Sequence, residues 1–141
     1  MAFKILIMGL PGSGKTTLAK KVVKFTNAHW LNADKVRNKF NDWDFSEKGI
    51  VRQVKRMNQL SKKTKKKYVV ADFICPLHKQ VRIFKPDIII WMDTIKKGRF
   101  ENMNRIFKKP KHFDLRLKRK NLSKNYSKVK KLINDFRFNI R

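Results

Sequence analysis

The chain has 141 residues, of which 41% are hydrophobic and 11% aromatic, and its 37 Lys and Arg against 10 Asp and Glu give a formal net charge of +27. This length fits one compact domain over residues 1–141, and the apolar fraction excludes a chain that is disordered throughout. No run of roughly 18 apolar residues is present, so we expect no membrane-spanning helix. The N-terminus does not resemble a signal peptide, and a single cysteine, Cys75, fits a reducing compartment; we therefore expect a cytoplasmic protein.

The high positive charge has two explanations. Clustered Lys and Arg side chains can form a surface that attracts the phosphates of nucleic acid. Lys greatly outnumbers Arg in this chain, however, and Asn and Ile are also common, a bias that spreads charge over solvated helix ends and loops such as residues 62–67. We favour general basicity, which also attracts small polyanions.

Four short segments are predicted strands, at residues 3–8, 27–32, 68–71 and 87–92. A Gly- and Pro-rich turn at 9–14 leads into a helix over about 15–25, and a second helix is predicted over about 34–40. Ser46 is a predicted N-cap with Glu47 in the first turn of a longer helix. That helix has one apolar face, formed by Ile50, Val54, Met57 and Leu60.

Residues 111–141 are predicted to form an edge strand and a basic amphipathic helix. Apolar residues alternate in the strand, at Phe113, Leu115 and Leu117. In the helix they recur at steps of four and three, at Leu122, Tyr126, Val129, Ile133, Phe136 and Ile140. Strands that alternate with helices predict an α/β fold, a three-layer sandwich with a mainly parallel sheet of about five strands and helices on both faces.

The strongest motif is Gly9-Leu10-Pro11-Gly12-Ser13-Gly14-Lys15-Thr16, a full match to the phosphate-loop pattern G-x-x-x-x-G-K-[ST] between a predicted strand and a predicted helix. It predicts the fold of a P-loop NTPase that binds ATP through this loop and Thr17, with Lys15 at the β- and γ-phosphates and Thr16 on Mg²⁺. A chance match in this context is rare. The chain has no Asn-Lys-x-Asp motif, which favours ATP over GTP.

Four other residues are candidates for the chemistry. Asp34 opens a helix at the edge where a parallel sheet binds its ligands, so it can serve a substrate hydroxyl or simply cap its helix. Arg37, one turn later, can bind an anionic group. Asp72 and Asp93 end predicted strands and can hold Mg²⁺ through its water shell; Asp72 is the better candidate, and its alternative role is to anchor a loop.

A basic group has the composition of a mobile lid that neutralises charge during phosphoryl transfer: Arg99, Arg105, Lys108 and Lys109. We place these residues on a helix and the segment after it. Cys75 and His78 lie close together, but no further ligands accompany them, so we predict no zinc site.

These segments resemble the adenylyl-sulfate kinase family, whose members transfer the ATP γ-phosphate to the ribose 3′-hydroxyl of adenylyl sulfate. The resemblance runs from Lys4 to about Pro110 and is carried by GLPGSGKTTLA, NADKVR, FSE, DFICP, WMDT and RIFKK, which begin at residues 9, 32, 45, 72, 91 and 105. It implies that Asp34 and Arg37 act at the catalytic site and that Phe45 packs on the substrate adenine. It further implies that the phosphosulfate end is held by Phe73, Ile74, Cys75 and Pro76, with Lys108 and Lys109 acting from the lid.

The chain departs from the family pattern at several positions. Asn32 stands where the family's DGDxVR segment has its first acid. The family's DRxxN segment, which supplies an arginine and an asparagine to the substrate, falls on Gly49-Ile50 and Gln53; Arg52 or Arg56 are the nearby substitutes. The lid's RDPKG element is not retained.

The leading interpretation is an adenylyl-sulfate kinase in sulfate activation and assimilation, with Asp34 orienting or deprotonating the 3′-hydroxyl. One alternative is another P-loop kinase that acts on a nucleotide, a small molecule or a polynucleotide 5′ end. A second is a nucleotide-dependent nucleic-acid-binding protein. We expect a small nucleotide as partner and no membrane; nucleic acid is not favoured, and the oligomeric state stays open, a dimer being one option.

Overall fold

The computed structural model describes the backbone of residues 1–140 and the side chains of residues 1–137. Its strands are β1 (Phe3–Met8), β2 (His29–Asn32), β3 (Tyr68–Phe73), β4 (Ile88–Met92) and β5 (Leu115–Leu117). Its helices are α1 (Lys15–Thr26), α2 (Ala33–Phe40), α3 (Glu47–Lys63), α4 (His78–Phe84), α5 (Glu101–Ile106) and α6 (Leu122–Ile140). Strands and helices alternate along most of the chain, as the sequence predicts.

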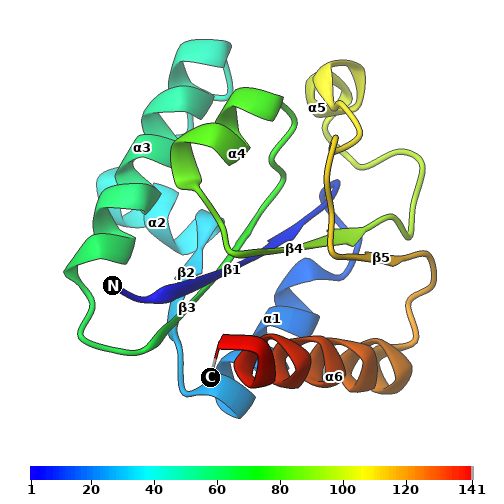
Figure 1. The fold of residues 1–141 in the computed structure, drawn as a ribbon. Coiled ribbons are helices and arrows are strands. Elements are labelled where there is room, and N and C mark those ends of the chain that lie inside the picture. The colour runs from blue at the N-terminus through cyan, green and yellow to red at the C-terminus, as the bar shows by residue number, and fades with distance from the viewer. Residues whose placement is uncertain (141) are drawn as a thin grey trace.

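The strands form one parallel sheet in the order β2-β3-β1-β4-β5. Helices α2, α3 and α4 cover one face, and α1 and α6 cover the other (Figure 1). Successive side chains of β1 serve the two resulting cores, because Ile5 packs with Val129 of α6 and Leu6 packs with Met57 of α3. The predicted three-layer α/β fold is therefore confirmed. In the described residues, no helix has both the length and the apolar character needed to cross a bilayer.

Some strand boundaries differ from the prediction. β3 continues past Ala71 to Phe73, and Asp72 is paired with Ile7 inside the sheet. The predicted second strand loses its first two residues because Asn27 adopts a left-handed conformation (φ 54°) that ends α1. These shifts place Asp72 within the carboxyl end of a strand, whereas the sequence analysis put it just after one.

The C-terminal elements agree with the prediction. β5 is a three-residue edge strand parallel to β4. Val129 and Ile133 of α6 are fully buried, and the other predicted apolar positions that are described pack against the same core, namely Leu122, Tyr126 and Phe136. The side chain of Ile140 lies outside the described residues. Two differences occur before β5: α4 was not predicted, and α5 begins after Arg99, which we had placed on the helix.

Candidate active site

The carboxyl ends of β2 and β3 and the loop that follows β1 border a cavity of about 490 Å³, hereafter the central cavity. It is lined by the phosphate loop and start of α1, the start of α2, the segment that ends β3, and residues around the start of α5. A larger groove of about 810 Å³ runs along α3, but no residue of the phosphate loop lines it. Ligands of parallel α/β sheets bind at the carboxyl ends of the strands, so we place the site in the central cavity.

The phosphate loop has a backbone shape that requires glycine. Gly12 and Gly14 have φ values of 86° and 101°, in the left-handed region. A Cβ on Gly9 would lie 2.6 Å from the carbonyl oxygen of Met92, so no side chain fits there. The first turn of α1 has no side-chain cap and no acidic residue. Its N–H groups, together with the positive end of the helix dipole, can therefore bind an anion.

Two further features of this loop fit a phosphate ligand. The Oγ of Ser13 is buried and has no hydrogen-bond partner among the described residues. The Nζ of Lys15 donates to the carbonyl oxygen of Leu10 at 2.9 Å. Burial lowers the pKa of Lys15 from 10.5 to about 8, although the carboxylates of Asp72 and Asp34 act in the opposite direction. A half-buried cation of this kind gains from a nearby polyphosphate.

Asp72 is the centre of a small polar cluster at the bottom of the site. Its carboxylate accepts hydrogen bonds from the Thr16 hydroxyl at 3.0 Å, from Trp30 Nε1 at 3.0 Å and from Asn32 Nδ2 at 3.0 Å. Burial raises the pKa of Asp72. A carboxylate beside a hydroxyl at the foot of the phosphate loop is a set of hard oxygen donors that suits Mg²⁺. No cluster of three or more His, Cys, Asp or Glu occurs among the described residues, so a metal here would depend on phosphate oxygens and water as well.

The structure excludes one of the two roles considered for Asp34, that of helix cap. The N-cap of α2 is Asn32, whose Oδ1 accepts from the backbone N–H of Lys35 at 3.0 Å. Asp34 is therefore not the cap, and it lines the central cavity together with Lys15.

Arg37 and two aromatic rings form a stack in the lining of the central cavity. The guanidinium of Arg37 lies 4.2 Å from the centre of the Phe45 ring. The other aromatic ring is that of Phe100, stacked on Phe45 with centroids 5.8 Å apart and an interplanar angle of 27°. Arg37 is 5% exposed, and its Nη1 donates to the carbonyl oxygens of Asp42 and Asp44. Burial lowers the pKa of Arg37.

The segment after Asp72 contributes Phe73, Ile74, Cys75 and Pro76 to the cavity wall, as expected. Cys75 has a positive φ of 54° and is 2% exposed. Burial raises the pKa of its thiol and so disfavours a reactive thiolate paired with His78. His78 Nε2 instead lies 2.8 Å from the carbonyl oxygen of Lys109.

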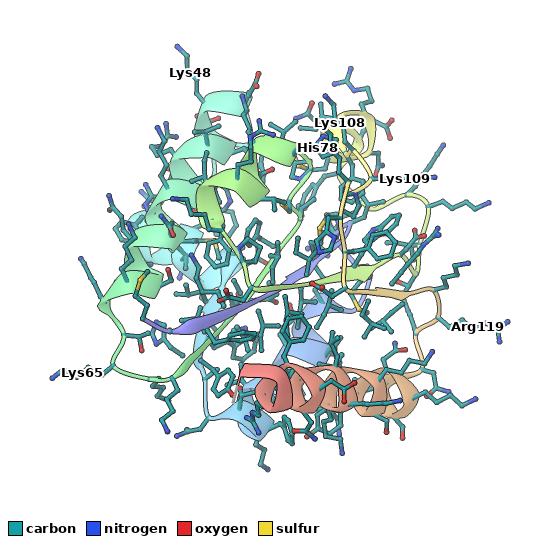
Figure 2. All side chains as sticks on the ribbon, in the orientation of Figure 1. Lys48, Lys65, His78, Lys108, Lys109 and Arg119 are labelled. Atoms are coloured by element: carbon teal, nitrogen blue, oxygen red, sulfur yellow. The ribbon has the colours of Figure 1, made fainter. Side chains whose placement is uncertain are left out.

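Several predicted site residues do not line the central cavity. From the loop these are Gly9, Leu10 and Ser13, whereas Pro11, Gly12, Gly14, Lys15, Thr16 and Thr17 do line it. Of the predicted lid residues, only Arg99 lines the cavity. Lys108 and Lys109 are exposed and point outward (Figure 2). The side chain of Arg105 donates a hydrogen bond to Asn102 on its own helix. Asp93 pairs with Arg116 rather than facing the loop.

The suggested substitutes Arg52 and Arg56 do not line the central cavity either. Both bind the carboxylate of Asp42, and Arg52 also binds Asp44. They hold the loop 41–46 against α3, which positions Phe45. Gly49 contributes to the same packing, because a Cβ there would overlap the Asp44 carbonyl oxygen.

Sequence reasoning did not assign a site role to several lining residues: Asn32, Ala33, Ile50, Gln80, Phe100, Met103 and Lys120. Asn32 was noted only as a departure from a motif. Phe100 and Lys120 lie in segments with no motif, and only the fold brings them to the cavity.

A family model described as an AAA domain matches residues 5–77, just over half of the chain. The chain belongs to this AAA domain family. The match covers the phosphate loop, Asp72 and the segment that follows it. No curated protein shows significant sequence similarity to the chain.

Several solved kinase structures are similar to the chain. The APS kinase CysC of Mycobacterium tuberculosis, in complex with AMPPNP and APS, has 19% identity and a TM-score of 0.78, with 94% of this chain and 98% of that chain covered. Shikimate kinase from Acinetobacter baumannii, in complex with shikimate, has 15% identity and a TM-score of 0.67, with 96% and 94% covered. A gluconokinase from Sinorhizobium meliloti has 9% identity and a TM-score of 0.69, with 99% and 98% covered. At these low identities, the TM-scores show a shared fold, which is that of P-loop kinases.

Proposed function

We propose that residues 1–141 act as one kinase domain that transfers the γ-phosphoryl group of ATP to the 3′-hydroxyl of adenylyl sulfate. The observation that carries this proposal is the position of the Arg37–Phe45–Phe100 stack, which lines the same cavity as the phosphate loop. A planar base stacks well on aromatic rings and guanidinium groups. An acceptor with such a base would be held facing the phosphates of ATP.

The ATP end of the cavity would work through residues of α1 and β3. The N–H groups of the loop and of the first turn of α1 would bind the phosphates, and Lys15 would neutralise the β- and γ-phosphates. When bound, Mg²⁺ supplies positive charge between these phosphates. Thr16 and Asp72 are the residues that would hold it, Thr16 directly and Asp72 through water.

The acceptor end would use α2 and the stack. Phe45 and Phe100 would separate to admit the adenine of the acceptor. Asp34 lines the cavity and would orient the 3′-hydroxyl or take its proton as the hydroxyl oxygen bonds to the γ-phosphorus and the bond from that phosphorus to ADP breaks. Arg37, Arg99 and Lys120 also line the cavity and are the cations available for the phosphosulfate group, where the family's usual arginine is replaced by Ile50.

That replacement also favours a second candidate, a P-loop kinase that acts on another small alcohol. A cavity without the usual arginine binds a phosphosulfate group less strongly. The shikimate kinase, solved in complex with shikimate, and the gluconokinase have the same fold as this chain. Their acceptors are therefore included in the test.

The test is an ADP-release assay with Mg-ATP and a panel of acceptors: adenylyl sulfate, adenosine 5′-monophosphate, shikimate, gluconate and an oligonucleotide with a free 5′-hydroxyl. We expect turnover with adenylyl sulfate and little with the others. Arg99→Ala should raise the KM for adenylyl sulfate about tenfold and leave the KM for ATP unchanged, since loss of one charged contact costs about 1.5 kcal/mol. Lys65→Ala, remote from the cavity, is the control. Turnover with shikimate or gluconate alone would select the second candidate, and turnover with oligonucleotide ends alone would reject both.

A further inference from the structure

A third concave surface, distinct from the central cavity and from the groove along α3, lies where β5 meets α6. It encloses about 350 Å³ and is lined only by basic and amide side chains: Arg116, Lys118, Arg119, Asn121, Lys124, Asn125 and Lys128. We call it the β5–α6 basic pocket. Five of its seven lining residues are cationic and none is acidic, which gives a local positive field.

Most of these cations have no carboxylate partner among the side chains that the structure describes. Arg116 pairs with Asp93 through its Nε at 2.9 Å. Among the described residues, no ion pair involves the other four cations of the pocket: Lys118, Arg119, Lys124 and Lys128. Lys124 and Lys128 are four residues apart on α6 and therefore share one face of the helix. Unpaired like charges held together repel one another, and an anionic ligand would relieve that repulsion.

The pocket is built on a fixed loop. Asn125 is 6% exposed, and its Nδ2 donates to the carbonyl oxygen of Arg119 at 2.7 Å. Asn121 Oδ1 accepts from the backbone N–H of Lys124 at 3.1 Å. These two bonds tie residues 119–121 to the first turn of α6, so the backbone that presents the cations is ordered before any ligand binds.

The lining chemistry distinguishes between classes of polyanion. A helix that binds a membrane surface inserts an apolar face into the lipid. The apolar face of α6 is already used, because Val129 and Ile133 are fully buried against the core. The pocket has no aromatic side chain on which bases can stack. Lys, Arg and Asn are among the residues that contact phosphate and sugar, and such contacts carry no sequence information.

We propose that the β5–α6 basic pocket binds the sugar-phosphate backbone of a nucleic acid independently of base sequence. The four unpaired cations set the strength of this binding. The site does not depend on the proposed kinase acceptor, since none of its lining residues lines the central cavity. Lys120 lies on the same loop but lines the central cavity, so a strand bound in the pocket would pass beside the nucleotide site.

The experiment measures the affinity of the full chain for a labelled oligothymidylate of about 20 nucleotides by fluorescence anisotropy, at salt concentrations between about 50 and 200 mM. If four cations replace counterions on a single strand, the slope of log affinity against log salt is about −3. The test variant is Arg119→Glu/Lys124→Glu. Its matched control is Lys65→Glu/Lys66→Glu, which changes the formal charge by the same four units; Arg119 and Lys65 lie at opposite edges of the molecule (Figure 2).

We expect the test variant to bind at least about tenfold more weakly, with about half the salt slope, and the control to stay within about twofold of the wild type. Equal weakening in both variants would mean diffuse charge and would overturn the proposal. So would an oligonucleotide that does not bind the wild type at all. Vesicles with anionic headgroups form a third arm: if the pocket variant loses vesicle binding while oligonucleotide binding is unaffected, the occupant is a lipid surface and the proposal is wrong.

Discussion

The hydroxyl of Thr16 donates a hydrogen bond of 3.0 Å to Asp72 Oδ2, which joins the first turn of α1 to the carboxyl end of β3. Asn32 Nδ2 reaches the same carboxylate, at 3.0 Å from Oδ2. The amide and hydroxyl protons satisfy Asp72 in the way that a cation would. A metal ion bound beside Asp72 would replace some of these hydrogen bonds. A substitution that removes one of them should therefore change how strongly the metal stabilises the protein.

Asn32→Asp tests this arrangement. The new carboxylate can still cap α2, but it cannot donate to Asp72, and two adjacent acids repel. Without Mg²⁺ we expect a stability loss of about 1–3 kcal/mol, which lowers Tm by several degrees. Adding Mg²⁺ should raise the Tm of this variant more than that of the wild type, because two carboxylates attract the cation more strongly. Thermal unfolding with and without MgCl₂ measures both effects.

The control for this experiment is Asn32→Ala, which removes the cap and adds no charge. It should lower Tm in both conditions and show no enhanced response to Mg²⁺. If Asn32→Asp responds to Mg²⁺ no more than the alanine variant does, the cluster is not a metal position.

Lys15→Met should stabilise the protein when no nucleotide is present. The pKa of Lys15 is about 8 in the folded state against 10.5 as the model-compound value, so burying the charge costs stability below pH 8. Between pH 8 and 10.5 the folded state releases the proton first, and the cost disappears as pH rises. At pH 7 we expect a gain on the order of 1 kcal/mol, which should vanish by about pH 10.5. Urea denaturation across this pH range measures it.

When nucleotide is bound, we expect the wild type to be more stable than Lys15→Met. Mg-ATP should raise the stability of the wild type and have little effect on Lys15→Met, because the phosphates lose their cationic partner. Lys20→Met, on the exposed side of α1, is the matched control and should behave as the wild type does. A methionine variant that is less stable at pH 7 and still protected by Mg-ATP would contradict the assignment.

Gly49→Ala should displace the loop that carries Phe45. The added Cβ would overlap the Asp44 backbone, which α3 holds through Arg52. Overpacking of this kind costs about 1–3 kcal/mol. Lys48→Ala, the adjacent exposed residue in the same helical turn, should change stability by less than about 0.5 kcal/mol. Chemical denaturation of the pair measures the difference, and equal stabilities would mean that the loop is not clamped.

Phe100→Ala should affect the acceptor and not ATP. Phe100 is 42% exposed and stacks on Phe45, so its removal costs little stability and takes one wall from the base site. Base stacking is worth about 1–3 kcal/mol, which corresponds to a rise in acceptor KM of about five- to 150-fold. Phe113→Ala removes a ring of similar exposure, 39%, that lies outside the cavity and should leave both KM values unchanged. If Phe100→Ala raised only the KM for ATP, Phe100 would contact ATP and not the acceptor, and the prediction would be wrong.

Local patterns predicted much of the fold. β1 and α1 follow from an apolar run, a glycine loop and helical spacing, all contained in adjacent residues. The extension of β3 to Phe73 was missed because Asp72 is polar, and only donors from Trp30, Thr16 and Asn32 make its burial tolerable. α4 was missed because seven residues give too little periodicity to recognise.

The site was predictable where a motif marked it and not elsewhere. The phosphate loop was identified from its motif and Asp34 from its position after a predicted strand, and residues of the loop line the central cavity together with Asp34. Phe100 was not, because nothing in the sequence indicates that residues 55 positions apart will stack. Arg52 was considered as a substrate contact, but it pairs with Asp42. Whether its side chain faces the cavity or Asp42 depends on how α3 is rotated about its axis, which the sequence alone does not fix.

Cys75, the one cysteine of the chain, lies sealed in the wall of the central cavity. A thiol that is buried and protonated hardly reacts with alkylating reagents. The rate at which Cys75 is labelled therefore reports how often the cavity wall opens. A ligand that keeps Phe73–Pro76 in place will slow the labelling, and one that displaces it will speed it up. The protein thus contains its own reporter of cavity motion, and no residue needs to be engineered to read it.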